Sequence, residues 1–101
     1  MVDYSAFAFP KNPPARDKAH LAYVRLQICA VVGNDCGGVT EAAHIGVAGK
    51  GIKASDFLTV PLCTKHHIES HGAGVYTFQG NHGVSLWEVA ARLLAKRMEE
   101  R

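Results

Sequence analysis

The residues best suited to chemistry are the cysteines and histidines in the middle of the chain. Four of the six histidines lie between positions 44 and 71, and the three cysteines cannot all pair with one another. The first 20 residues lack the basic and apolar regions of a signal peptide, so we expect a reducing compartment. Thiols close to histidines then favour metal binding over disulfides. The pattern predicts metal chemistry between Cys29 and His71.

The first candidate site combines Cys29 and Cys36 with the later pair Cys63-x2-His66. Structural zinc takes four thiolate or imidazole ligands in a tetrahedron, and a Cys-x2-His pair opening a helix is a common half of such a site. Six residues separate Cys29 from Cys36, so the glycines of this loop must let it fold back. The alternative is that Cys29 is a buried core thiol, since free cysteine is among the most buried residue types. We predict that the four residues hold a structural zinc ion.

The second candidate site combines His44 with His67 and His71. Residues four apart share one face of a helix, so His67 and His71 can present two imidazoles to one divalent cation, such as magnesium, manganese, nickel or zinc. Such a cation can polarise a phosphate oxygen, and an unliganded histidine can take a proton from the attacking water. We assign the proton transfer to His44. The alternative is a solvated helix end, in which His71 helps to cap the helix before Gly72.

Short elements must position these residues. The pattern predicts an extended arm at 1–14, a helix from 14 to about 27, a thiol-bearing loop at 29–38, strands at 39–45 and 58–62 joined by a loop at 47–56, and helices at 64–71 and 86–100. Ser85 and Glu88 form a capping box at the start of the last helix, which carries an apolar stripe. The predicted fold class is α+β, with one domain at 15–101.

Composition excludes several other classes of protein. The chain has 101 residues, enough for one compact domain, and its 48% hydrophobic and 20% charged residues argue against disorder. No apolar stretch is long enough to cross a membrane. A net charge of +2 does not by itself identify a protein that binds nucleic acid. We expect a cytoplasmic protein.

The residues at both candidate sites occur in an order that resembles a known family. The order Ala-His-Ile, a glycine-rich loop and then Val-Pro-Leu-Cys-x2-His-His-x3-His resembles small HNH nucleases of phage and prophage origin, including the recombination-enhancement (Ref-type) nucleases. The segment from His20 to Cys29 is similar to the sequence that precedes the first zinc cysteine in such proteins. The resemblance covers roughly residues 16–90, and the ordered set is more specific than any one piece.

The resemblance implies a zinc-stabilised ββα-metal domain (the HNH or His-Me finger fold) with flanking N- and C-terminal helices. In this fold a hairpin and the following helix clasp one catalytic metal ion beside the structural zinc. His44 would be the general base, and His67 and His71 would bind the catalytic metal. The implied activity is metal-dependent hydrolysis of DNA phosphodiester bonds by a protein encoded by a bacterial host or a phage. DNA is the implied partner, together with a recombinase filament if the Ref-type likeness extends to partners.

Two positions depart from the family pattern. Family members often carry a metal ligand directly before the base, where this chain has Ala43, and the central asparagine of the motif is missing. Asp56 is the best substitute, because it can orient His44 or complete the metal shell. The departures leave a second hypothesis open, that of a catalytically silent zinc module that binds nucleic acid or a protein.

Basic residues near the second site are the candidate contacts to DNA. Lys50 and Lys53 lie in the loop between the predicted strands, and Lys65 lies beside the paired histidines. Such residues can neutralise phosphates without reading the base sequence. The alternative for each is a solvated surface lysine.

Overall fold

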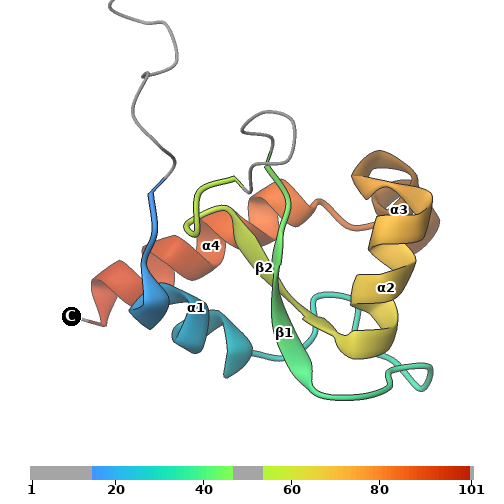
Figure 1. Ribbon diagram of the computed structural model, residues 1–101, viewed down its shortest axis with the longest axis horizontal. Helices are drawn as coiled ribbons and strands as arrows, with labels where there is room; N and C mark the ends of the chain where they lie inside the picture. The colour runs from blue at the N-terminus through green and yellow to red at the C-terminus, as the bar shows by residue number, and fades with distance from the viewer. Residues whose placement is uncertain (1–14, 47–53, 101) are drawn as a thin grey trace, which may run out of the picture.

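A two-stranded antiparallel hairpin lies at the centre of the fold, with helices on both sides of it (Figure 1). The computed structural model describes residues 15–46 and 54–100. The elements in chain order are α1 (Lys18–Arg25), β1 (Thr40–His44), β2 (Thr59–Cys63), α2 (Thr64–Ala73), α3 (Val75–His82) and α4 (Leu86–Glu99). The mixed helix and sheet composition agrees with the predicted α+β class, including the flanking helices α1 and α4. The predicted arm at 1–14 lies outside the described residues.

The hairpin supplies the framework for both candidate sites. β1 pairs with β2 in a register that runs from Thr40 opposite Cys63 to His44 opposite Thr59. All five residues of β2 are buried, as expected for a strand packed on by α1, α2 and α4. α2 follows β2 without a loop, so that Cys63 is both the last residue of the strand and the N-cap of the helix.

The first helix begins later than predicted. We expected a helix from 14 to 27, whereas α1 spans Lys18–Arg25. The Asp17 side chain accepts a hydrogen bond of 2.9 Å from the His20 N–H and so fixes the N-cap. The Asp17 N–H donates to an Asp56 carboxylate oxygen over 2.8 Å, and the Asp56 N–H donates to the Ala15 carbonyl, so residues 15–17 are joined to the loop before β2.

A third helix, α3, forms where the sequence predicts no element. Its Phe78 side chain is completely buried and packs edge-on against the His66 ring, with centroids 6.5 Å apart. Gly74 joins α2 to α3 at a φ of 87°, a left-handed conformation that favours glycine. The buried aromatic contact stabilises a helix that has little amphipathic pattern of its own.

The last helix agrees closely with the prediction. The Ser85 hydroxyl accepts a hydrogen bond of 3.3 Å from the Glu88 N–H, so this half of the predicted capping box is confirmed. Leu86 and Ala90 are buried in the core cluster that includes β2, whereas Met98 is 62% exposed, so the buried stripe ends before the last turn. Within the described ranges, no helix is long and apolar enough to cross a membrane.

Candidate functional site

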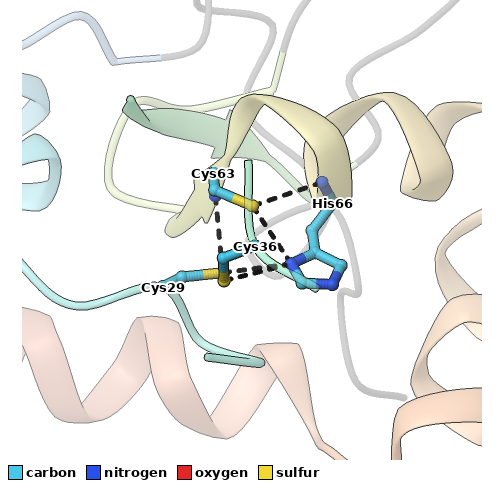
Figure 2. A group of neighbouring side chains, drawn as sticks. All are labelled: Cys29, Cys36, Cys63 and His66. Carbon is cyan, nitrogen blue, oxygen red and sulfur yellow. Dashed lines mark hydrogen bonds between the residues drawn. The ribbon is translucent and has the colours of Figure 1, made fainter. Parts of the chain in front are cut away.

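Three cysteines and one histidine from distant parts of the chain meet at the junction of β2 and α2 (Figure 2). The ligand atoms of Cys29, Cys36, Cys63 and His66 all lie within 4.8 Å of one another. The His66 Nδ1 atom is 3.6 Å from the Cys29 sulfur, 3.6 Å from the Cys36 sulfur and 3.1 Å from the Cys63 sulfur. The four residues form a cluster that could hold a metal ion.

These separations fit tetrahedral coordination. With Zn–S bonds near 2.3 Å and Zn–N bonds near 2.0–2.1 Å, a tetrahedron places sulfur and nitrogen about 3.6 Å apart. Two of the three nitrogen–sulfur separations equal that edge. The Cys63 separation is shorter by about half an ångström, a difference that a small side-chain rotation would remove. The donor set and its spacing therefore fit a cluster that could hold a structural metal ion, and Cys29 also lies within the hydrophobic core.

The wide loop between Cys29 and Cys36 closes through two consecutive turns. The Val32 N–H donates to the Cys29 carbonyl over 3.0 Å, and the Cys36 N–H donates to the Gly33 carbonyl over 3.1 Å. Gly38 then lies against α2 at a φ of 82°, where a Cβ atom would be 2.5 Å from the Thr64 side chain. Only glycine fits at that point of contact.

The surroundings of the cluster shift the pKa values of its members in both directions. Burial raises the pKa of the Cys29 thiol. Burial would lower the pKa of His66, but its contacts with Asp35 and Cys63 outweigh burial and raise it. Burial would raise the pKa of the Cys63 thiol, but the N–H groups of His66 and Gly37 directed at its sulfur outweigh burial and lower the pKa to about 6. The His66 Nε2–H donates to an Asp35 carboxylate oxygen over 3.0 Å, which leaves Nδ1 with the lone pair that faces the sulfurs. Asp35 was not among the predicted site residues.

A second pair of metal-binding residue types lies beside His66. Glu69 and His82 are hydrogen-bonded to each other, and with His66 they form another compact group. The two ring nitrogens of His66 are already taken by the sulfurs and by Asp35. We therefore describe Glu69 and His82 as a pair that flanks the cysteine cluster.

The second candidate site is a cleft between α1, β1 and α2. Its volume is about 250 Å³. The residues that line it are Leu21, Arg25, Ala42, His44, His67 and His71. The three histidines that the sequence pattern grouped thus converge on one cleft, although His44 is 23 positions from His67 in the sequence. Neighbouring residues on α2 serve different sites, because His66 faces the cysteines while His67 faces the cleft.

Asp56 holds the His44 ring from the side of the loop before β2. The His44 Nε2 atom is 2.8 Å from an Asp56 carboxylate oxygen, and Asp56 is only 4% exposed. Burial would raise the pKa of Asp56, but hydrogen bonds from His44 and the Asp17 N–H, with the nearby Arg16 charge, outweigh it and hold the pKa below its usual range. An ionised Asp56 accepts the Nε2–H of His44 and leaves Nδ1 as the basic nitrogen. This geometry fits the first of the two roles considered for Asp56.

Glu41 holds the His67 ring in the same way. The His67 Nδ1–H donates to a Glu41 carboxylate oxygen over 2.7 Å, which leaves the lone pair on Nε2. That Nε2 atom is 3.1 Å from the Nε2 atom of His71. The hydrogen bonds from His67 and from Thr64 hold the pKa of Glu41 below its ordinary value, so the carboxylate is ionised at neutral pH. Sequence reasoning missed Glu41, because the contact depends on how α2 packs on β1.

Of the three lysines predicted to contact DNA, the structure describes only Lys65. Lys50 and Lys53 lie outside the described residues. Lys65 is exposed and lies against Gly37 in the thiol-bearing loop, and it is not among the residues that line the cleft. Arg25 does line the cleft, and within the described part of the chain it has no ion pair. The sequence signal for Arg25 was its place near the end of the predicted helix, four residues before Cys29.

Comparisons with known proteins give a family without an assigned activity. A family model described as "Protein of unknown function (DUF968)" matches residues 3–99. The chain is 33% identical over 82 residues to "Uncharacterized protein YdfU" of Escherichia coli (strain K12). That match covers 78% of this chain but 23% of the relative, so the chain spans about a quarter of the length of that protein. No solved structure matches. The chain belongs to the DUF968 family.

Proposed function

We propose that this domain is an HNH-type, metal-dependent endonuclease that hydrolyses phosphodiester bonds in DNA. The observation that carries the proposal is the cleft in which His44, His67 and His71 converge beside Arg25. A β-hairpin followed directly by a helix supplies the three histidines, which is the element order expected of a ββα-metal domain. DNA as the substrate follows from the resemblance of the sequence motifs.

His44 would act as the general base. Its Nε2–H is bound to Asp56, so Nδ1 is the atom that can take a proton from a water molecule in the cleft. The ionised Asp56 carboxylate would fix the ring and stabilise the imidazolium that forms when the proton arrives. Asp56 would thereby supply the orientation for which other HNH proteins use the missing asparagine.

His67 and His71 would hold the catalytic metal. Their Nε2 atoms are 3.1 Å apart, close to the separation of about 3.0–3.4 Å expected for two nitrogens that share one cation. A bound divalent cation would polarise a phosphate oxygen and stabilise the developing charge. Arg25 would hold the phosphate through its planar guanidinium group, whose paired N–H donors match phosphate oxygens.

The cysteine cluster would hold zinc in a structural role. Four protein ligands complete a tetrahedron and leave no open position for water or substrate. Because the ligands come from the loop before β1 and from the junction of β2 and α2, a bound ion would join segments distant in sequence. Metal binding would therefore be coupled to folding, as is common in small domains with limited cores.

One observation favours a second candidate function, a zinc-stabilised module that binds nucleic acid or a protein without cutting. Ala43 stands where many HNH proteins carry a metal ligand, and it is 2% exposed in the core. With His44 acting as the base, the described residues that line the cleft leave only His67 and His71 to hold a metal. Two imidazole ligands suit ions such as nickel or zinc, whose remaining positions can be filled by water and phosphate oxygens, so cleavage remains the leading proposal.

A nicking assay tests the proposal. Supercoiled plasmid is incubated with the purified protein and magnesium, manganese or nickel, with and without chelator. The His44→Ala variant is compared with His82→Ala, because both histidines pair with a carboxylate and are about one-fifth exposed, but only His44 lines the cleft. We expect chelator-sensitive nicking that falls by about two to four orders of magnitude in His44→Ala and persists in His82→Ala.

Two results would contradict this proposal. Nicking by His44→Ala within a few-fold of wild type would remove His44 as the base. DNA binding by the wild-type protein without nicking under any metal would favour the silent module. Because the Ref-type resemblance implies a recombinase filament, DNA coated with a recombinase is included as a second substrate before the silent module is accepted.

A further inference from the structure

Glu41 contacts the His67 ring at the nitrogen that faces away from His71. One Glu41 carboxylate oxygen is 2.7 Å from the His67 Nδ1 atom, and the other accepts a hydrogen bond of 3.1 Å from the Thr64 hydroxyl. Thr64 begins α2, so the carboxylate on β1 is anchored to the same helix that carries His67. Both oxygens are thus held, and the carboxylate has a defined orientation.

The contact determines which nitrogen of His67 carries the proton. An ionised carboxylate only accepts hydrogen bonds, so it favours the form of His67 with a proton on Nδ1 and a lone pair on Nε2. The Nε2 atom is 3.1 Å from the Nε2 atom of His71. Two lone pairs at that separation repel each other unless a proton or a cation lies between them. The pair is therefore suited to share a cation.

Glu41 is placed to act through His67 and not as a metal ligand itself. Alternate residues of a strand point to opposite faces, and Ala42 and His44 line the cleft. Glu41 is not among the lining residues, and its contact to His67 is made at the ring nitrogen remote from His71. A carboxylate in this position beyond a histidine ligand fixes the ring and raises its basicity.

We propose that Glu41 is the positioning residue of the cleft, which holds the proton on Nδ1 of His67 and so presents Nε2 to a divalent cation shared with His71. The inference rests on the proposed function in taking the cleft as a metal centre. It adds that metal affinity is set by a residue of β1 that lies outside the cleft lining. It also explains how two histidines bind a cation without a ligand at position 43.

The test compares Glu41→Ala and Glu41→Gln with the matched control Glu69→Gln. Glu69 also pairs with a histidine, His82, but neither residue lines the cleft. Nickel alone is titrated by calorimetry into tag-free protein whose cysteine site is already loaded with zinc. In the same samples before nickel is added, ¹⁵N NMR of the imidazole nitrogens reports the protonated nitrogen of His67.

We expect wild-type His67 to carry its proton on Nδ1. Glu41→Ala should weaken nickel binding about 10- to 100-fold, the usual effect of losing such a partner, and should change the proton distribution of His67. Nicking by Glu41→Ala should recover as nickel is raised, because the base and the metal ligands remain. Glu41→Gln should lie between wild type and Glu41→Ala, since its amide can accept the same hydrogen bond without charge. Glu69→Gln should bind nickel within about twofold of wild type.

The role of Glu41 and the nuclease activity can be refuted independently of each other. If Glu41→Ala and Glu41→Gln bind nickel as wild type does, or if wild-type His67 carries its proton on Nε2, the role of Glu41 is overturned even when the wild type nicks DNA. If the wild type never nicks but nickel affinity and the His67 proton follow Glu41, the nuclease activity is overturned and the role of Glu41 stands. Should Glu41→Ala fail to fold, Glu41→Gln carries the test, because it preserves size and an acceptor.

Discussion

The sharpest prediction concerns the neighbours His66 and His67, which the geometry assigns to different sites. Adjacent residues of a helix point about 100° apart, so one ring can face the cysteines while the next faces the cleft. We expect His66→Ala to lose metal and stability, and His67→Ala to stay folded and metal-loaded but inactive. Ile68→Ala is the control, because Ile68 is the next residue of the helix and is 67% exposed.

The expected loss of stability for His66→Ala follows from its burial and contacts. The ring is completely buried between the three sulfurs and Phe78. Removal of a large buried side chain costs about 2–5 kcal/mol. Loss of the bound metal costs about 4 kcal/mol more when the free metal concentration is about 1,000 times the Kd. In a domain of this size each kcal/mol lowers Tm by about 4–8 °C. We therefore expect Tm to fall by more than about 10 °C, with release of zinc.

His67→Ala is expected to keep most of its stability and its zinc but to lose activity. The ring is 21% exposed and makes one hydrogen bond to a carboxylate that is itself 38% exposed. Loss of such a bond costs about 0.5–1.5 kcal/mol, which lowers Tm by about 2–12 °C. Metal stabilisation of the transition state contributes several kcal/mol, so the nicking rate should fall by about a hundredfold or more.

Thermal melts, zinc release and nicking measured on the three variants decide the question. The reasoning would be refuted by loss of activity without loss of stability in His66→Ala together with unfolding of His67→Ala, because the helix register would then be shifted by one residue. Stable and active proteins from both variants would mean that the two histidines are ordinary helix residues. Ile68→Ala should resemble the wild type throughout.

Three other predictions follow from single contacts. Cys36→Ser should release zinc and lower Tm, and a strong chelator should have the same effect on the wild-type protein. If Cys36→Ser retained its zinc, a residue other than Cys36 would have to be the fourth ligand. Arg25→Ala should reduce the single-turnover nicking rate about 10- to 100-fold, because a charged hydrogen bond to the phosphate is lost, and Arg25→Lys should recover part of the rate. If Arg25→Ala and wild type nick at equal rates at saturating metal, Arg25 does not contact the phosphate. The His20 N–H lowers the pKa of Asp17 below its ordinary value of 3.8, so this contribution to stability is present above that pH and is lost as pH falls through the folded-state pKa. Asp17→Asn should therefore approach wild-type stability in acid melts, and a constant difference would contradict the assignment.

The sequence predicted the parts of the site that follow from local spacing. The Cys-x2-His pair and the two histidines four apart fixed which faces of α2 meet which neighbours, because helical geometry is set by the chain itself. The hairpin followed from two apolar runs separated by a glycine-rich loop. The strand ends were within one residue of the predicted bounds, with β1 at Thr40–His44 and β2 at Thr59–Cys63.

The parts that the sequence did not predict depend on packing between distant segments. α3 has only one buried residue, Phe78, and contains Gly80, which disfavours a helix interior. Its stability comes from the contact of Phe78 with His66 on α2, which no local pattern reveals. Asp35 and Glu41 were missed for the same reason, because each finds its histidine only after the thiol-bearing loop and β1 have packed against α2.

Cys63 explains how one short helix can position residues for both candidate sites. It ends the buried strand β2, accepts a hydrogen bond from the His66 N–H as N-cap of α2, and offers its sulfur to the cysteine cluster. A bound zinc would therefore fix both the start of α2 and its rotation about its own axis. With that rotation fixed, His67 and His71 can only face β1 and α1, where Glu41 and Arg25 lie. The cysteine cluster would thus determine the geometry of the cleft, although within the described residues no hydrogen bond joins the cleft histidines to the cysteines.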